Sequence, residues 1–180
     1  MLILASGSPR RRELLARITP DFVVRPTGCD ETLAENDPAR RVLELSRRKA
    51  LAAAPGPGDI VLAADTIVAL DGDILEKPAD ADDARRMLRA LSGRTHAVYT
   101  GVALRKNDRL ENFCCRTAVT FWELDDALID EYVRSGEPLD KAGAYGIQGK
   151  GALLVKGIDG DFFNVMGLPV AAVYRALARL

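Results

Sequence analysis

A nearly continuous run of apolar residues from Ile60 to Ala64 most constrains how this chain can fold. A half-buried strand alternates apolar and polar residues, whereas an unbroken run predicts a strand that is covered on both faces. Asp65 and Thr66 interrupt the run, and a second apolar segment then leads to Asp71-Gly72, the signal of a tight hairpin turn. We therefore expect this region at the centre of a sheet, with Asp65 at or just inside the end of a buried strand.

Helices and strands alternate irregularly along the rest of the chain. Capping residues and proline or glycine boundaries predict helices that begin near residues 9, 38, 81, 126 and 169. Apolar runs predict further strands near residues 2–5, 22–24, 74–75, 95–105, 111–123 and 152–158. Some strands follow a helical crossover and others a short hairpin, so the order predicts an α/β fold with a mixed sheet. The Pro-Gly-Pro-Gly segment at 55–58 is the expected hinge between lobes.

Length, charge and cysteine content exclude several classes of protein. A chain of 180 residues suffices for one domain or two closely joined lobes. A net charge of −1 and 6% aromatic residues argue against nucleic acid or an anionic membrane as a partner. The cysteines, Cys29, Cys114 and Cys115, are odd in number and lack CxxC spacing, so neither a disulfide framework nor a zinc site is expected. No segment approaches the length of a membrane span or a signal peptide, which predicts a cytoplasmic protein.

The N-terminal segment predicts a strand, a tight turn and the start of a helix. The small residues Ser6, Gly7 and Ser8 let the backbone turn closely, and Ser8 before Pro9 is a good N-cap. Residues 10–12 are three arginines in the first helical turn, where the helix dipole disfavours cations. A bound anion would remove this cost, so the segment predicts a phosphate-binding site. A solvated basic turn is the alternative.

Asp65 is the most informative acidic residue. An ionised carboxylate at a buried strand end is costly unless it is paired, bound to a metal or used in chemistry, and strand ends in open α/β sheets border the ligand crevice. The carboxylate could activate water, hold Mg²⁺ or do both, or it could cap a neighbouring loop. Glu31, in an acidic pair within a polar loop, is a second candidate metal ligand.

Residues 137–151 are rich in glycine and charge and are expected to form a functional loop. The most informative part of this loop is the segment 140–149, Asp-Lys-Ala-Gly-Ala-Tyr-Gly-Ile-Gln-Gly. Its glycines predict close approach of the backbone to a ligand, and the amide of Gln148 offers both a donor and an acceptor to a base edge. A flexible surface loop is the alternative. His96, the only histidine, lies in a predicted strand and is expected to be structural, which argues against Ser-His-Asp chemistry.

Together these features outline one site for phosphoryl chemistry. Such chemistry needs cations and a metal to neutralise developing charge, and a carboxylate to orient water. The predicted phosphate ligands are Ser6, Ser8, Arg10, Arg11, Lys49, Lys77 and Lys141, and the predicted metal ligands are Glu31 and Asp65. The sequence contains no GxxxxGK[ST], which excludes a P-loop NTPase.

Motifs distributed along the whole chain resemble those of the Maf family. They are SGSPRR at 6–11, DE at 30–31, KA at 49–50, ADT at 64–66, EKP at 76–78, LSG at 91–93, TGV at 100–102, SGEPLDKAGAYGIQG at 135–149, GD at 160–161 and NV-GLP at 164–169. The family comprises nucleoside triphosphate pyrophosphatases that use a divalent metal and release a nucleoside monophosphate and pyrophosphate. The resemblance implies one domain over residues 1–180, with a bent mixed sheet flanked by helices. It also implies two lobes with a central cleft, similar to the inosine triphosphate pyrophosphatases.

The resemblance further implies roles for individual residues. Asp65, in the ADT motif, would be the proton acceptor that activates water, with Mg²⁺ or Mn²⁺ as the cofactor. Arg10, Thr66 and Gln148 would select the nucleotide, and they match the branch of the family that acts on dTTP and UTP. The branch that acts on 7-methyl-GTP tends to carry an aromatic residue, a glutamine and a glutamate at these positions. The sequence therefore predicts a dTTP and UTP pyrophosphatase.

Other functions stay open from the sequence. One is a pyrophosphatase of the same fold for 7-methyl-GTP or deaminated purine nucleotides, against which the three specificity residues argue. Another is a nucleotide-binding regulator, because family members have been linked with inhibition of septum formation in dividing bacteria. A pure binder would not need Asp65 together with Glu31, Lys49 and Lys77. Housecleaning of modified nucleotides is one role that such an enzyme could have, and the resemblance leaves a homodimer open.

Overall fold

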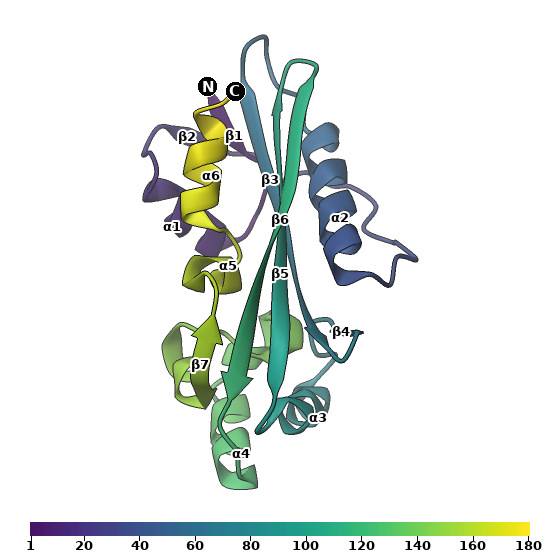
Figure 1. Ribbon diagram of the computed structural model, residues 1–180, viewed down its shortest axis with the longest axis vertical. Coiled ribbons are helices and arrows are strands. Elements are labelled where there is room, and N and C mark those ends of the chain that lie inside the picture. Colours follow the sequence, from purple (N-terminus) through teal and green to yellow (C-terminus); the bar gives the residue numbers. More distant parts are fainter.

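The apolar run that dominates the sequence forms β3 (Ile60–Leu70), the central strand of a computed structural model that describes residues 1–180 (Figure 1). β3 continues without a break through Asp65 and Thr66, so the expected interruption is wrong. These residues pair with Gly101 and Thr100 of β5 (Thr95–Lys106). The ladder is built from backbone N–H and C=O groups, which polar residues also carry, and a polar side chain therefore does not end a strand.

Seven strands form one mixed sheet, as the sequence predicts. The strand order is β2-β1-β3-β5-β6-β7, and β4 pairs with the far end of β3. β1 (Leu2–Leu4) runs parallel to β2 (Phe22–Val24) and to β3. The other pairs, which involve β4 (Asp73–Leu75), β5, β6 (Arg109–Phe121) and β7 (Val155–Asp159), are antiparallel. Parallel strands need a crossover and antiparallel strands allow a hairpin, so one sheet contains both kinds of connection that the sequence predicts.

Six α-helices accompany the sheet: α1 (Pro9–Ala16), α2 (Pro38–Ala52), α3 (Ala81–Leu91), α4 (Asp126–Arg134), α5 (Phe162–Met166) and α6 (Val170–Leu177). The first four begin as predicted, because the N-cap side chain accepts a hydrogen bond from the backbone N–H three residues on. These N-caps are Ser8, Asp37, Asp80 and Asp125. The sequence does not predict α5, since five residues are too few for a helical period to show.

The loop predicted at 137–151 contains three short 3₁₀ helices. They are η1 (Glu137–Asp140), η2 (Ala142–Ala144) and η3 (Gly149–Leu154). Because η3 extends to Leu154, the strand expected from residue 152 begins only at Val155. The loop is therefore folded backbone with its own hydrogen bonds, and residues 143–147 are buried.

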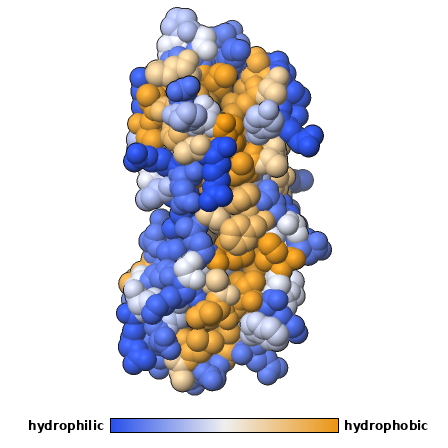
Figure 2. Space-filling model, turned by 90° about the vertical axis from the view of Figure 1, so that its left-hand side faces the viewer, coloured by the Kyte–Doolittle hydropathy of each residue, from blue (hydrophilic) through white to orange (hydrophobic).

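The helices gather in two groups along the sheet (Figure 1). α1, α2 and α6 lie with β1 and β2 at one half of the molecule, and α3, α4 and the 3₁₀ helices lie with β4 and β7 at the other. β3, β5 and β6 run through both halves, and the outline narrows between them (Figure 2). One cluster of 27 buried residues includes Leu14 of α1, Leu88 of α3 and Ile129 of α4, so the two halves share a core.

The expected hinge at 55–58 does not lie between these halves. The segment joins α2 to β3 at the outer end of one half, where the Gly58 N–H donates to Asn107 Oδ1 at 3.2 Å. The three long strands join the halves instead. Their ladder hydrogen bonds hold them side by side, so the connection is a twisted sheet and not a single linker.

The expectations about membranes and disulfides can also be compared with the structure. None of the helices is both long and apolar enough to cross a lipid bilayer. The three cysteines, Cys29, Cys114 and Cys115, are free thiols in the structure.

A glycine lets α2 lie close to the sheet beside Asp65. Gly101 pairs with Asp65 in the ladder, and a Cβ at Gly101 would lie 2.2 Å from the Val42 carbonyl oxygen of α2. Any side chain at this position would push the helix away from the sheet. The close packing brings Lys49, near the C-terminal end of α2, within contact of Asp65.

Candidate functional site

All of the site residues predicted from the sequence line one cavity of about 670 Å³ between the two halves of the molecule. They are Ser6, Ser8, Arg10, Arg11, Glu31, Lys49, Asp65, Thr66, Lys77, Lys141 and Gln148. The cavity is also lined by Arg41, Glu76 and Asp140, which the sequence reasoning does not select. Glu76 stands in the EKP motif and Asp140 begins the glycine-containing segment, so motif membership could have identified both. Arg41 carries no such signal.

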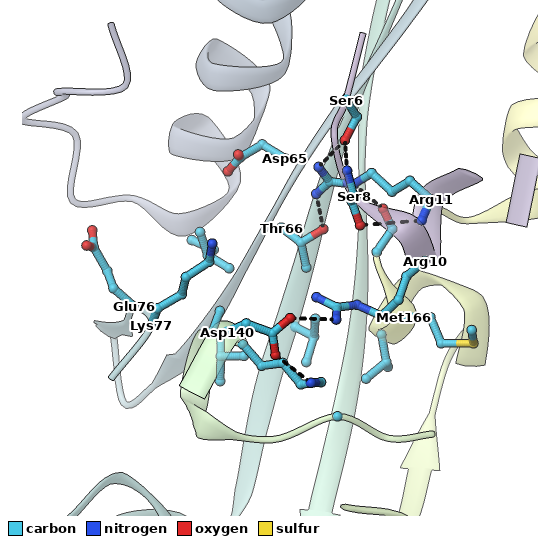
Figure 3. A pocket seen from close by; sticks show the side chains of 18 of the residues that line it. Ser6, Ser8, Arg10, Arg11, Asp65, Thr66, Glu76, Lys77, Asp140 and Met166 are labelled. Atoms are coloured by element: carbon cyan, nitrogen blue, oxygen red, sulfur yellow. Dashed lines mark hydrogen bonds and ion pairs between the residues drawn. The ribbon is translucent and has the colours of Figure 1, made fainter. Parts of the chain in front are cut away.

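The cavity lies at a gap along one edge of β3. β1 pairs with β3 only at residues 60–62, and β4 pairs with it only at residues 68–70, which leaves residues 63–67 without a strand partner on that edge. Neighbouring side chains of a strand point to opposite faces, so Asp65 points toward α2 and Thr66 toward Arg11 (Figure 3). A ligand in the gap can therefore reach both faces of the sheet. The strand end expected at Asp65 is absent, because β3 continues to Leu70; the pairing with β1 already ends at Leu62.

The N-terminus of α1 presents two hydroxyl groups and an arginine to the cavity. Ser8 Oγ accepts from the Arg11 backbone N–H at 3.4 Å, and Ser6 Oγ accepts from the Ser8 N–H at 3.3 Å. The Arg11 guanidinium donates to Ser6 Oγ at 3.3 Å and to the Gly167 carbonyl oxygen at 2.9 Å. Burial lowers the pKa of Arg11, and the nearby Asp65 carboxylate opposes this shift. The site thus holds a cation at a helix N-terminus, and both the cation and the helix N-terminus favour binding of an anion.

The Thr66 hydroxyl can accept a hydrogen bond from a ligand but cannot donate one. Its hydroxyl lies 3.0 Å from the donor Arg11 Nη2 and 2.9 Å from the Thr100 hydroxyl. Thr100 donates its own proton to the Asn164 carbonyl oxygen at 2.9 Å, so the Thr66 hydroxyl must donate to Thr100. The acceptor position that remains on Thr66 suits an N–H donor.

Lys49 contacts both predicted metal ligands. Its Nζ lies 2.6 Å from Asp65 Oδ1 and 3.2 Å from Glu31 Oε2. The Asp65 side chain is only 11% exposed, so this ion pair offsets much of the cost of removing the carboxylate from water. Asp65 Oδ2 makes no hydrogen bond with the protein and remains available to water or a cation. No three His, Cys, Asp or Glu side chains form a group that could hold a metal by themselves.

Asp140 binds two of the predicted cations. Its Oδ2 lies 3.3 Å from Arg10 Nη1, and its Oδ1 lies 2.6 Å from Lys141 Nζ. Burial by itself would raise the pKa of Asp140, but the hydrogen bonds from Lys141 and Arg10 outweigh it and lower the pKa. Lys77 lines the cavity, and its Nζ makes neither an ion pair nor a hydrogen bond, so it remains free for a ligand.

Two ion pairs bridge the cavity from one half of the molecule to the other. One is Arg10–Asp140, and the other joins Arg41 of α2 to Glu76 after β4, with 2.6 Å between Nη2 and Oε1. The two carboxylate side chains are each 66% exposed. Exposed ion pairs contribute about 0–1 kcal/mol, so an anionic ligand could displace either pair at little cost.

Two glycines of the segment 140–149 lie against side chains of the same loop. A Cβ at Gly146 would lie 2.7 Å from Lys141 Cε, and a Cβ at Gly149 would lie 2.8 Å from Glu137 Oε2. The atoms that approach these glycines belong to the protein itself. Side chains of the same loop therefore occupy the space beside these two glycines. Gly146 also lines the cavity, and close approach of a ligand to its backbone stays a prediction.

Gln148 presents an unpartnered polar atom at the cavity. It lines the cavity, and its Oε1 is buried without a hydrogen-bond partner. A buried amide oxygen without a donor is costly. A ligand that donates a hydrogen bond to this oxygen would remove that cost.

His96 is buried and does not line the cavity, in agreement with the structural role expected for it. Its Nε2 lies 2.7 Å from the Tyr145 hydroxyl, and its ring meets that of Phe121 edge to face. Burial lowers the pKa of His96 to about 4, so the imidazole is neutral at physiological pH. Tyr145 itself lines the cavity, and His96 therefore supports one wall from behind.

Comparison with known proteins places the chain in a family. The model of the Maf-like protein family matches residues 1–180. The chain is 54% identical over 181 residues to a dTTP/UTP pyrophosphatase from Moorella thermoacetica, which covers 98% of this chain and 93% of that protein. It is 52% identical over 178 residues to a protein of the same name from Bacillus velezensis, with coverage of 98% and 94%. A solved structure of a HAM1 protein from Coxiella burnetii matches with a TM-score of 0.55 at 15% identity, covering 99% of this chain and 98% of that one. At this identity the structural likeness supports the fold alone, and it confirms the predicted α/β fold with a mixed sheet.

Proposed function

The chain belongs to the Maf family, and on that basis we propose that it hydrolyses dTTP and UTP to the nucleoside monophosphate and pyrophosphate. The relatives called dTTP/UTP pyrophosphatase, about half identical over nearly the whole chain, support the choice of substrates. The observation that carries the proposal is the set of groups that line one cavity. It combines a carboxylate with a free oxygen, a cationic helix N-terminus and a buried amide oxygen that lacks a partner.

The triphosphate is proposed to bind to the cationic side of the cavity. The helix N-terminus after Ser8 and the buried guanidinium of Arg11 favour an anion, and Lys77 is free to bind one. Arg10 and Lys141 now contact Asp140 and would turn to the phosphates when an anion competes for them. Lys49 reaches the same space from α2 while it holds Asp65.

Glu31 and Asp65 are proposed to hold Mg²⁺ or Mn²⁺. Mg²⁺ in nucleotide sites is typically bound through one or two carboxylates together with substrate phosphates and water. Two carboxylates that both contact Lys49, with no third protein ligand grouped beside them, fit that mode of binding. A bound divalent cation supplies neutralisation of the charge on the phosphate oxygens.

Asp65 is proposed to accept the proton of the attacking water. Its Oδ1 is held by Lys49, which orients the carboxylate, and its Oδ2 can accept a hydrogen bond from water. The water oxygen forms a bond to the α-phosphorus as the bond from that phosphorus to the bridging oxygen breaks. The proton passes to Asp65, and pyrophosphate leaves with its charge neutralised by the surrounding cations.

The pyrimidine base is proposed to bind beside Gln148 and Thr66, with Arg10 as the third specificity residue. Thymine and uracil carry an N3–H donor, which suits the unpartnered Gln148 Oε1 or the free acceptor position on Thr66. Both halves of the molecule contribute to this cavity. We therefore also propose that residues 1–180 act as one unit, and that they do so in the cytoplasm.

A panel of nucleotides tests this function. The protein is incubated with dTTP, UTP, GTP, ATP, inosine triphosphate and 7-methyl-GTP in the presence of Mg²⁺ or Mn²⁺, and pyrophosphate and orthophosphate are measured separately. We expect pyrophosphate from dTTP and UTP, little from GTP or ATP, and none after the cation is removed with EDTA.

Each other result of the panel contradicts a different part of the proposal. Pyrophosphate mainly from 7-methyl-GTP or inosine triphosphate would keep the site and change the substrate. Orthophosphate as the first product would change the bond that is cleaved. Nucleotide binding without any product would favour a binding protein over an enzyme.

A further inference from the structure

The loop that carries Gln148 is folded around one carboxylate. Glu137 Oε2 accepts from the Lys150 N–H at 3.1 Å, and Oε1 accepts from the Gly151 N–H at 3.2 Å. These are backbone donors at the start of η3, the 3₁₀ helix for which Gln148 is the N-cap. Gln148 has no side-chain capping bond of its own, so Glu137 supplies the acceptors that this helix start requires.

A tyrosine extends the same network toward the cavity. The Tyr132 hydroxyl donates to Glu137 Oε1 at 3.0 Å and accepts from the Gly146 N–H at 3.0 Å. Burial raises the pKa of Tyr132, so the phenol keeps the proton that it donates. Glu137 and Tyr132 together bind the backbone at Gly146, two residues before Gln148, and at Lys150, two residues after it.

The glycine spacing of the loop follows from this arrangement. A Cβ at Gly149 would lie 2.8 Å from Glu137 Oε2. A Cβ at Gly151 would lie 2.0 Å from the Gly146 carbonyl oxygen and 2.8 Å from the Tyr132 hydroxyl. The backbone can wrap around the carboxylate and the phenol only where side chains are absent. Glu137 is only partly exposed, and neither Glu137 nor Tyr132 lines the cavity, so both act on a ligand only through the backbone that they hold.

We infer that Glu137 is a positioning residue for base recognition, since it places the Gln148 amide against the nucleotide base. The inference rests on the proposed function, in which Gln148 contacts the pyrimidine. The inference separates two parts of the site. The phosphates are bound by α1, Lys49, Lys77 and Lys141, whose Nζ donates to the backbone oxygen of Glu137 and not to its carboxylate. The base depends on the loop that the Glu137 carboxylate holds. Loss of the Glu137 carboxylate should therefore weaken binding of the base and leave binding of the phosphates unchanged.

The variant Glu137→Gln tests the inference. Glutamine has nearly the same shape, but its NH₂ group would face one of the backbone N–H donors and cannot accept from it. The matched control is Glu131→Gln, a change of the same kind at an exposed position of α4. Calorimetry in EDTA, where no turnover is expected, gives the Kd of UTP and the Kd of inorganic tripolyphosphate, which has the phosphates and lacks the base.

We expect Glu137→Gln to raise the Kd of UTP about tenfold, because hydrogen bonds to a charged group are lost. The Kd of tripolyphosphate should change less than about twofold. Glu131→Gln should change neither constant. Equal losses for both ligands would show a general structural role and overturn the inference, as would unchanged UTP binding.

Two further measurements keep the test decisive. If Glu137→Gln does not unfold cooperatively, Tyr132→Phe removes the acceptor for the Gly146 N–H and should produce the same selective loss of UTP binding. Selective loss in neither variant overturns the inference. Failure of the proposed function would give a different result. The wild-type protein would then release no pyrophosphate from dTTP or UTP with Mg²⁺, even if the variants lose UTP binding and keep tripolyphosphate binding.

Discussion

Replacing His96 with glutamine should remove much of the acid sensitivity of this fold in the mildly acidic range. His96 is 3% exposed, and the groups that face its ring are Tyr145 and Phe121. Burial raises the pKa of Tyr145, so that phenol stays neutral and brings no negative charge to an imidazolium. Because no carboxylate contacts the ring, protonation of His96 in the folded protein is opposed by burial without compensation.

The sign and size of the effect follow from the two pKa values. Burial lowers the pKa of His96 from 6.5 to about 4 in the folded protein. As the pH falls below 6.5, the unfolded chain binds a proton that the folded protein does not, and unfolding becomes more favourable. The stability is therefore fully present above pH 6.5 and is lost as the pH falls toward 4. At 1.36 kcal/mol for each pH unit, the total loss is about 3 kcal/mol, of which about 2 kcal/mol falls between roughly pH 7.5 and pH 5.

Urea unfolding followed by far-ultraviolet circular dichroism measures this difference. The free energy of unfolding is determined for the wild-type protein and for His96→Gln at both pH values, with m-values compared to confirm that the same transition is observed. Glutamine offers the Tyr145 hydroxyl a polar partner and does not titrate, and acidic residues elsewhere affect both proteins equally. Between roughly pH 7.5 and pH 5 the variant should lose about 2 kcal/mol less than the wild type. Equal losses in the two proteins would refute the reasoning.

Two other substitutions test the site and the packing behind it. Asp65→Asn should lower the rate of pyrophosphate release at least about a hundredfold, the usual contribution of a general base, while cooperative unfolding is retained. The control is Asp73→Asn, at an exposed position of β4. Retained activity in Asp65→Asn would contradict the proposed role of Asp65. Gly101→Ala should lower the free energy of unfolding by about 1–3 kcal/mol, because its Cβ would lie 2.2 Å from the Val42 carbonyl oxygen. Gly157 is a strand glycine with no atom near its Cβ position, so Gly157→Ala should change the free energy of unfolding far less. Similar losses of stability in the two variants would argue against close packing of α2 as the cause.

Local features of the sequence predict the secondary structure well. The first four helices begin at capping residues whose hydrogen-bond partners lie three positions away, so a short window contains all the information. The strands follow from apolar runs in the same way. α5 and the 3₁₀ helices are missed because each is too short to show a period.

The candidate site residues come from the sequence as well, through chemistry and motif membership. Residues as distant as Arg10 and Gln148 line the same cavity, which a sequence without contacts cannot show by itself. Their roles in binding and hydrolysis remain predictions. Asp140 and Glu76 stand in motifs and could have been selected, whereas Arg41 could not. That Arg10–Asp140 and Arg41–Glu76 form ion pairs across the cavity depends on which surfaces face each other.

Tertiary structure alone decides how these parts work together. The sequence shows that Asp65 is a polar residue within an apolar strand, but only the pairing of β1 and β4 with β3 opens the gap that exposes it to a ligand. The sequence likewise shows a glycine-rich loop, but only the fold shows that Glu137 and Tyr132 fill its interior. Capping and strand propensity act over a few neighbouring residues and can be recognised in the chain. Strand order, close packing and ion pairing join residues far apart, and they exist only once the backbone has brought those residues together.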